Sequence, residues 1–590
     1  MRDILENKYE MLFETYHFDR PIDAQNINSI IRESLRAFMK ECRKPAIYCN
    51  GGHTRILMAD FMYELKNVKY IVDNYAKTQD DGGFQLIKDE ELEANEIDAV
   101  IISSFKYKDS IVERLKKEHP GIKYLNIYDK FAENGINLQS DYYYHNHPYH
   151  HYHTINTIQR KIDCLSEAEE DELKDAYREL ITEYLHIKDF RTAILYAKKL
   201  YRISDTEINR RLILDLEELY ETELEAASAV SENDVLMLCI DGLRRRDLSS
   251  QYMPKLSEEL NHHAYTFDHA YSFSTSTYES LIPVYSENSD LRTKYYENNI
   301  VPEKACRLIE KAKRQNRHIY FYTDMDEFIE CREIRRSDAF QTVTEKLWNF
   351  LLDACEEKNG LFYIHVLYES HFSFSNPYTK SPLISEGTAL LFDFLPQKGK
   401  RLRTDYEQQH IDSLHYLDDV LSTFVKRLQC RILLYADHGN LILKQNCQLH
   451  EIREAQLTCA EEWIQIPFAI MAPEMGSGVS HQLMTLMALN DVIDSLLEQR
   501  RYVTAQNEFV KIARSELYNP DFRHLYQEMG KEKCLQAFEA FVFQEGWKLL
   551  IYADGTKELY KGENDQIVSD NHLIERLFEK VKRCITVCKI

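Results

Sequence analysis

The sequence lacks the features of a membrane, secreted or disulfide-stabilised protein. No stretch approaches the roughly 20 consecutive apolar residues of a membrane-spanning helix, and the charged start MRDILENKYE lacks the apolar core of a signal peptide. The 13 cysteines show no CxxC spacing, which argues against a zinc knuckle or a disulfide framework. These absences predict a cytoplasmic protein with reduced thiols and no transmembrane segment.

The chain also lacks an excess of positive charge. It carries 73 Lys and Arg residues against 97 Asp and Glu residues, a formal net charge of -24 at pH 7. A protein this acidic repels a phosphate backbone unless a basic patch compensates, and the run RRR at 244–246 is too short to form one. We therefore expect no nucleic-acid partner.

The composition that remains is typical of a folded globular protein. Hydrophobic residues make up 44% and charged residues 29% of the 590 residues. A prior of about 150 residues per domain predicts three or four units. Changes of pattern along the chain predict four ranges: 1–138, 139–232, 233–500 and 501–590.

The first range has the rhythm of a parallel sheet. Strand-like PAIYCN, VKYIVDN and DAVIISS alternate with helix-like TRILMADFMYELK and DSIVERLKKEH, which predicts a small Rossmann-like α/β domain preceded by helices. Gly51 and Gly52 follow the first strand and Asp73 ends the second, where such a fold can hold the phosphate and the ribose of a nucleotide. The GxGxxG fingerprint is absent, so a plain scaffold without a nucleotide is the alternative.

The second range opens with a tract rich in histidine and tyrosine. Residues 142–153 read YYYHNHPYHHYH, and their imidazoles are possible zinc ligands. No acidic or cysteine partner lies at a fixed spacing, which favours a solvent-exposed linker. The following YRELITEYLHIKDFRTAILYAKKLYRI predicts one helical hairpin rather than a repeat array.

The third range predicts a large α/β domain with its site at the strand ends. Five apolar segments each end in polar groups: VLMLCIDG, IYFYTD, LFYIHVL, ILLYADHG and IPFAIMAP. Asp437 and His438 leave one strand together, and Asp241 leaves another. Buried carboxylates at strand ends need a cation or hydrogen-bond donors, so these residues predict a divalent metal site. A helix-capping Asp with a bystander His is the alternative.

Hydroxyl and imidazole groups elsewhere in this range are candidates to complete the site. The segment SFSTSTYES follows Asp241 in the chain, and a metal lowers the pKa of a bound hydroxyl and so activates it as a nucleophile. His365 ends a strand, and His371 and His450 lie in later loops. Each histidine alone is more commonly a surface or satisfied core residue. If these histidines meet Asp437 and His438 on one face of the sheet, a role of the histidines in the site is favoured.

The order of these motifs resembles a known superfamily. The series IDG, STSTYES, HVLYESHFSFSNPY, YEQQHIDSLHYLDDVL and ADHG resembles the alkaline phosphatase superfamily, within it the sulfatase-like branch that contains phosphoethanolamine and phosphoglycerol transferases. The resemblance runs from about residue 234 to the end. It implies an α/β/α domain followed by a small C-terminal sheet in FQEGWKLLIYADGTKELY. It implies metal ligands at Asp241, Thr277, Asp437 and His438 and a nucleophile at Thr277. It also implies substrate binding or acid–base catalysis by His371 and His450, and substrate binding by His365.

The sequence departs from that family at several positions. The transferases usually carry Glu where this chain has Asp241, and cysteines of the periplasmic transferases are replaced by Phe273 and Pro283. The interval from His365 to His371 is one residue longer than usual. STSTYES lacks the Pro and Arg of the sulfatase motif C/S-x-P-x-R, so sulfate ester hydrolysis is disfavoured.

The resemblance implies a metal-dependent phosphotransferase or phosphoester hydrolase that acts through a phospho-threonine. Thr277 is the expected nucleophile and Thr275 the fallback, while mixed oxygen and nitrogen ligands favour zinc or manganese. The expected substrate is a phosphoester or a glycan. IYCNGGHTRIL resembles modules attached to polysaccharide-modifying enzymes, which indicates a cell-envelope glycan modified with phosphoethanolamine or phosphoglycerol. The alternatives are a sulfuric ester hydrolase and a non-catalytic scaffold or binding protein of the same fold.

Overall fold

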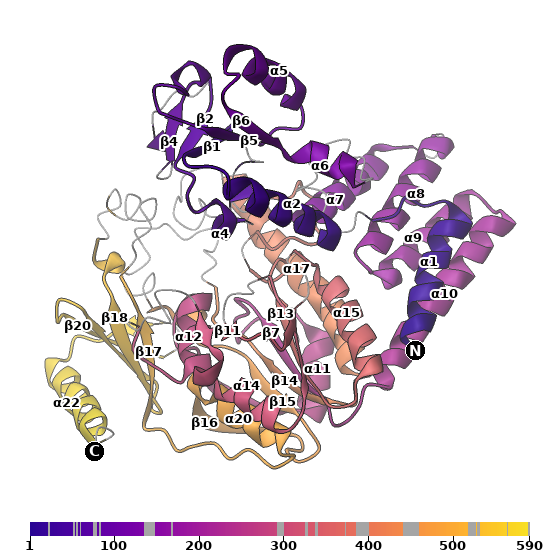
Figure 1. Ribbon diagram of the computed structural model, residues 1–590. Coiled ribbons are helices and arrows are strands. Elements are labelled where there is room, and N and C mark those ends of the chain that lie inside the picture. Colours follow the sequence, from indigo (N-terminus) through magenta and orange to yellow (C-terminus); the bar gives the residue numbers. More distant parts are fainter. Residues whose placement is uncertain are drawn as a thin grey trace. The chain divides into compact units, whose positions relative to one another are not determined.

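The computed structural model of the chain divides into two compact units (Figure 1). Unit 1 comprises Met1–Asp19 and Tyr152–Ile590, and unit 2 comprises Arg20–His151. The four ranges predicted from the sequence remain a prediction of the domain boundaries. The structure describes all residues except 22–23, 51–53, 55–56, 59–60, 75–79, 82–83, 135–147, 167–168, 292–299, 325–328, 337–339, 372, 385–399, 441–458, 517–526, 528–531, 563–564 and 588–590.

Unit 2 contains the expected Rossmann-like parallel sheet. Its strand order is β3-β4-β2-β1-β5-β6, and every pairing is parallel except β3 with β4. The order reverses between β1 and β5, as in a doubly wound sheet. The strands are β1 (Pro45–Tyr48), β2 (Tyr70–Val72), β3 (Asp80–Asp81), β4 (Phe84–Ile87), β5 (Ala99–Ile102) and β6 (Lys123–Asn126), and the helices are α2 (Ala24–Met39), α4 (Met62–Leu65), α5 (Lys108–Glu118) and α6 (Ile127–Glu133).

Unit 1 begins with helices that pack on one another. The predicted helical hairpin is confirmed as α8 and α9, and the side chain of Asp189 caps α9 by accepting from Thr192 N at 3.0 Å. Helix α1 contacts α10 and α15. The helices of this region are α1 (Arg2–Tyr16), α7 (Pro148–Cys164), α8 (Glu170–His186), α9 (Phe190–Ile203) and α10 (Glu207–Ser228).

The expectation of a solvent-exposed linker at 142–153 is wrong for the part that the structure describes. Pro148 begins α7, a position where its missing N–H costs nothing, and Tyr152 is fully buried within this helix. Tyrosine has an apolar ring with a polar hydroxyl, so a tyrosine of this tract can pack in the core when its hydroxyl finds a partner. Residues 142–147 lie outside the described residues.

The large sheet of unit 1 positions the predicted site. Its order is β12-β10-β13-β7-β14-β15-β8-β16, and β7, β13 and β14 in its centre are parallel and entirely buried. β15 runs antiparallel to both neighbours, so the sheet is mixed. The strands are β7 (Val235–Ile240), β8 (Tyr265–Tyr271), β10 (His318–Tyr322), β12 (Ile334–Arg336), β13 (Gly360–Val366), β14 (Arg431–Tyr435), β15 (Phe468–Met471) and β16 (Gly478–Thr485).

Helices cover both faces of this sheet, which confirms the predicted α/β class. α12, α14 and α20 contact one another on one face, and α11, α15 and α17 cover the other (Figure 1). These helices are α11 (Pro254–His263), α12 (Thr277–Ser286), α14 (Arg307–Arg314), α15 (Val343–Glu356), α17 (Lys400–Val425) and α20 (Leu489–Leu497); smaller elements are α19 (Glu461–Ile464) and the paired β9 (Val301–Pro302) and β11 (Ile329–Glu330).

The predicted C-terminal sheet is present as five antiparallel strands in the order β17-β18-β19-β20-β21. Among the described residues, no helix has both the length and the apolar character needed to cross a bilayer. The elements are β17 (Phe509–Arg514), β18 (Phe538–Phe543), β19 (Trp547–Tyr552), β20 (Lys557–Lys561), β21 (Gln566–Ile567) and α22 (Asn571–Val587).

Candidate active site

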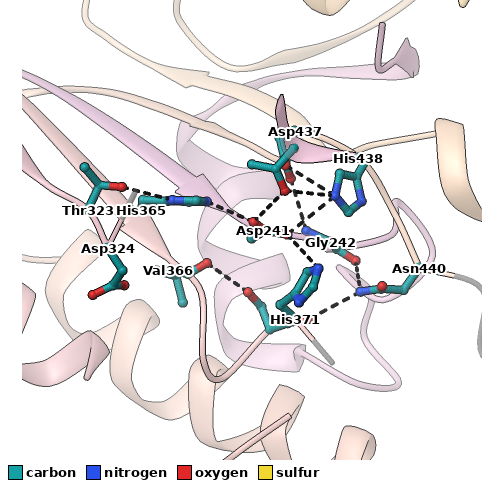
Figure 2. A network of polar contacts seen from close by, with 12 residues as sticks. Asp241, Gly242, Thr323, Asp324, His365, Val366, His371, Asp437, His438 and Asn440 are labelled. Atoms are coloured by element: carbon teal, nitrogen blue, oxygen red, sulfur yellow. Dashed lines mark hydrogen bonds and ion pairs between the residues drawn. The ribbon is translucent and has the colours of Figure 1, made fainter. Parts of the chain in front are cut away.

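Three neighbouring strands deliver carboxylate and imidazole side chains to one edge of the large sheet. Asp241 directly follows β7, His365 lies near the end of β13, and Asp437 comes two residues after β14. β7 lies between β13 and β14 and is parallel to both, so their carboxyl ends meet. Figure 2 shows the three side chains converging.

Thr277 is the hydroxyl that reaches this edge. It is the first residue of α12, directly after Ser276 at the N-cap. Its Oγ1 donates to Asp241 Oδ2 at 3.1 Å and lies 3.2 Å from His438 Nε2. The hydroxyls of Ser272 and Ser274 bond instead to Ser274 O and a carboxylate of α12, as expected of loop residues.

Both histidines of the HVLYESH segment also reach Asp241. His365 is fully buried, and its Nε2 lies 3.1 Å from Asp241 Oδ2 while its Nδ1 lies 3.2 Å from Thr323 Oγ1. The Nε2 atom of His371 lies 3.8 Å from the other carboxylate oxygen, Asp241 Oδ1. The longer interval between the two histidines therefore removes neither of them from the cluster (Figure 2).

The orientation of His438 leaves one nitrogen facing the acids. Its Nδ1–H donates to the carbonyl oxygen of Gly439 at 2.7 Å. The Nε2 atom lies 3.4 Å from Asp437 Oδ2 and 3.7 Å from Asp241 Oδ1. A hydrogen bond at Nδ1 presents the Nε2 lone pair to a cation, which is the usual arrangement of a metal-binding histidine.

The protonation equilibria of the cluster are shifted by burial and by mutual charge. Burial raises the pKa of Asp241, but three surrounding histidines, His371 foremost, outweigh burial and hold that pKa below its ordinary value. Burial and the Asp241 charge raise the pKa of Asp437. Burial lowers the pKa of His371 to about 4, whereas Asp437 and Asp241 outweigh burial and raise the pKa of His438. His371 is thus neutral at pH 7.

The cluster fits a divalent cation. Asp241 Oδ1 and Asp437 Oδ2 are buried and have no hydrogen-bond partner among the described residues, a costly state for carboxylates unless a cation neutralises them. One ligand atom each from Asp241, His371 and His438 lie within 4.8 Å of one another. Carboxylate, imidazole and hydroxyl donors suit zinc or manganese.

Asn440 is a site residue that the sequence reasoning missed. Its Nδ2 donates to Gly242 O at 2.8 Å and to Ser370 O at 3.4 Å, so one amide joins the loops after β7, β13 and β14 (Figure 2). Gly242 has φ of 67°, and a Cβ there would lie 2.2 Å from the same Nδ2 atom. The only sequence signal was the position of Asn440 directly after the ADHG motif.

The remaining predicted residues give no further geometry for this site. Gly51, Gly52 and His450 lie outside the described residues. Asp73 follows β2 in unit 2, where its N–H donates to Ile87 O at 2.9 Å. Nucleotide binding near Asp73 and the role of His450 therefore stay predictions.

Comparison with known proteins gives structural matches only. Neither the protein-family models nor the curated proteins contain a match. The similar solved structures include phosphonate monoester hydrolase SpPMH from Silicibacter pomeroyi, at 13% identity over 59% of this chain and 94% of that chain with a TM-score of 0.45. BT1596, a 2-O GAG sulfatase, is 11% identical over 60% of this chain and 91% of that chain, with a TM-score of 0.42.

A third similar structure is a protein in the alkaline phosphatase superfamily from Vibrio parahaemolyticus. It is 11% identical over 60% of this chain and 93% of that chain, with a TM-score of 0.39. A member of the alkaline phosphatase superfamily, a sulfatase and a phosphonate monoester hydrolase are what this chain is similar to in structure.

Proposed function

We propose that this chain is a metal-dependent phosphotransferase or phosphoester hydrolase of the alkaline phosphatase superfamily. The observation that carries the proposal is the Thr277 hydroxyl, which lies 3.1 Å from Asp241 Oδ2 and 3.2 Å from His438 Nε2 inside a buried, acidic cluster. A hydroxyl held between a buried carboxylate and an imidazole is the arrangement of an activated nucleophile. Asp241, Asp437, His438 and Thr277 would hold a zinc or manganese ion.

In the first step, Thr277 Oγ1 attacks the phosphorus of a phosphoester. The Oγ1–P bond forms, the bond from phosphorus to the leaving oxygen breaks, and a phospho-threonine results. When bound, the metal supplies charge neutralisation and a lowered pKa for the Thr277 hydroxyl. Asp241 Oδ2 already accepts the hydrogen bond of this hydroxyl, and its low pKa lets it pass the proton on through water to the departing oxygen, which leaves as an alcohol.

In the second step, water or an acceptor hydroxyl attacks the same phosphorus. The new O–P bond forms, the P–Oγ1 bond breaks, and the proton of the attacking group returns to Thr277 Oγ1, so the enzyme is regenerated. A neutral His371 beside Asp241 can hydrogen-bond a non-bridging phosphoryl oxygen in both steps. A hydrolase and a transferase differ only in the group that attacks here.

The order of the sequence motifs supports a more specific proposal. We infer that the protein transfers phosphoethanolamine or phosphoglycerol and that its substrate is a phosphoester or a glycan of the cell envelope. We also infer that the protein acts in the cytoplasm. The support is the resemblance of STSTYES and ADHG to the transferase branch and the Rossmann-like unit before the catalytic domain.

The deciding experiment is turnover of bis(p-nitrophenyl) phosphate by metal-free protein supplied with zinc or manganese, in parallel with an aryl sulfate. We expect metal-dependent release of nitrophenol from the phosphodiester and a mass increase on the peptide that contains Thr277. Release from the sulfate alone would favour a sulfuric ester hydrolase. Absence of release from both substrates with either metal would favour a non-catalytic scaffold.

A further inference from the structure

The loop that carries His371 contains a second buried acid, Glu369, which takes no part in the cluster around Asp241. Glu369 is 1% exposed, and its Oε1 accepts from the hydroxyl of Tyr152 at 2.5 Å and from Val343 N at 2.9 Å. Burial of a carboxylate is costly without donors, so these two hydrogen bonds hold Glu369 in place.

The partners of Glu369 belong to three different helices. Tyr152 lies on α7, and Val343 is the first residue of α15, where the helix dipole favours a negative charge. The backbone oxygen of Glu369 accepts from the hydroxyl of Ser413 on α17. One residue of the loop is thus fastened to α7, α15 and α17 together.

The loop between Glu369 and His371 is a tight turn. His371 N donates to Leu367 O at 2.8 Å, and Ser370 Oγ donates to Val366 O at 3.0 Å. The turn leaves no slack between the two side chains, so a shift of Glu369 is passed on to His371. This turn lies in the interval that is one residue longer than the family pattern.

Helix α7 also holds the far end of the same segment. One helical turn after Tyr152, the buried Nδ2 atom of Asn156 donates to Thr379 O at 2.6 Å and to Ser381 O at 2.9 Å. The Tyr152 ring packs edge-on against the ring of Tyr416 on α17, with the centroids 6.1 Å apart. Tyr152 and Asn156 of α7 therefore hold the segment on both sides of His371.

We propose that Glu369 is a positioning residue for His371 and that the Tyr152 hydroxyl of α7 keeps it in place. Helix α7, which lies outside the strands of the catalytic sheet, thereby sets the distance between His371 and Asp241. The inference rests on the proposed function, because it assigns His371 to the site at which phosphorus reacts. A merely structural role would stabilise α7 without affecting the His371 loop.

The test compares Tyr152→Phe with Tyr184→Phe as a matched control. Tyr184 is equally buried, and its hydroxyl accepts from Gln159 of α7 at 3.1 Å, away from Glu369. In Tyr152→Phe we expect about tenfold faster amide hydrogen exchange at residues 366–371 and about tenfold lower kcat on bis(p-nitrophenyl) phosphate, with KM little changed, from the loss of one charge-assisted hydrogen bond. Neither change is expected in Tyr184→Phe.

Variants of Glu369 supply a rescue test. Glu369→Gln keeps an acceptor oxygen for Tyr152 and Val343 and should retain most of kcat, whereas Glu369→Ala should lose it. Unchanged exchange at 366–371 in Tyr152→Phe would overturn the tether. Faster exchange with unchanged kcat would overturn the positioning role. A wild type without any turnover would overturn the proposed function itself, and the exchange rates would then still decide the tether.

Discussion

The Thr277 hydroxyl donates a 3.1 Å hydrogen bond to Asp241 Oδ2. Asp241 directly follows β7, and Thr277 begins α12, so the contact joins the end of a buried strand to the first turn of a helix. Two rigid elements meet there, and the distance between the two oxygens is therefore set by packing rather than by a flexible loop.

Loss of the Thr277 oxygen should abolish turnover. Thr277→Ala removes the nucleophile, and we expect kcat for metal-dependent phosphodiester cleavage to fall by about 10⁴-fold or more, the scale seen when a nucleophile is deleted. Thr277→Ser keeps the oxygen and should retain part of the rate. Thr275→Ala is the control, because Thr275 is the fallback nucleophile of the same loop. A larger loss in Thr275→Ala than in Thr277→Ala would exchange the two assignments.

Metal should stabilise the fold as well as support catalysis. Binding to the native state only, at a free concentration of about 100 times Kd, adds about 2.7 kcal/mol to the free energy of unfolding. Asp437 Oδ2 is one of the orphaned buried oxygens, so Asp437→Asn should reduce this gain. Thermal unfolding with chelator and with added zinc or manganese measures this stabilisation as a rise of Tm. If the metal raised the Tm of wild type and of Asp437→Asn equally, the ion would bind at a site without Asp437.

Asn440 should act through the loops that it joins. Asn440→Asp replaces both amide donors by an acceptor that faces Gly242 O and Ser370 O, so we expect metal affinity to fall by about 10- to 100-fold, as for other residues that support metal ligands. Chelator competition measures the affinity. Asn359→Asp is the matched control, because Asn359 Nδ2 also donates to two carbonyls, those of Gln315 and Asn316 at 3.2 and 3.4 Å, and neither belongs to the site. Equal effects in both variants would contradict the assignment.

Stability should fall in mild acid because of His410. Burial lowers the pKa of His410 to about 3, with Arg244 and Arg246 adding to burial and Asp247 opposing it. The unfolded chain takes up this proton near pH 6.5. Between about pH 6.5 and 3 the unfolded state thus binds more protons, and the free energy of unfolding falls as the pH falls, by at most about 1.4 kcal/mol per pH unit.

The free energy of unfolding of His410→Asn and of wild type, measured by denaturant between about pH 6.5 and 3, checks the role of His410. We expect this free energy to depend less steeply on pH in the variant. His262→Asn, at an exposed position of α11, is the control and should keep the wild-type slope. The same slope in His410→Asn and wild type would show that other groups cause the acid sensitivity.

Much of the fold was predictable because local patterns carry it. Continuous apolar runs such as VLMLCI and ILLYA are compatible with strands buried on both faces, and the segments between them have helical periodicity. The α/β class and the helical hairpin were therefore confirmed. The C-terminal sheet is also present, but it was expected from the family resemblance rather than from a local pattern. The prediction of a solvent-exposed linker was wrong for residues 148–153, because composition does not reveal which face of a helix another element will cover.

By itself, the sequence determined which chemical groups are available: carboxylates and imidazoles at the ends of apolar strands, and hydroxyls at the start of a helix. The tertiary structure decided which of them meet. The order of β13, β7 and β14 in the sheet brings Asp241, His365 and Asp437 to one edge, and only packing places Asn440 against Gly242 and Tyr152 against Glu369. Such contacts join residues far apart in the chain, and hydrophobic periodicity reports only on near neighbours.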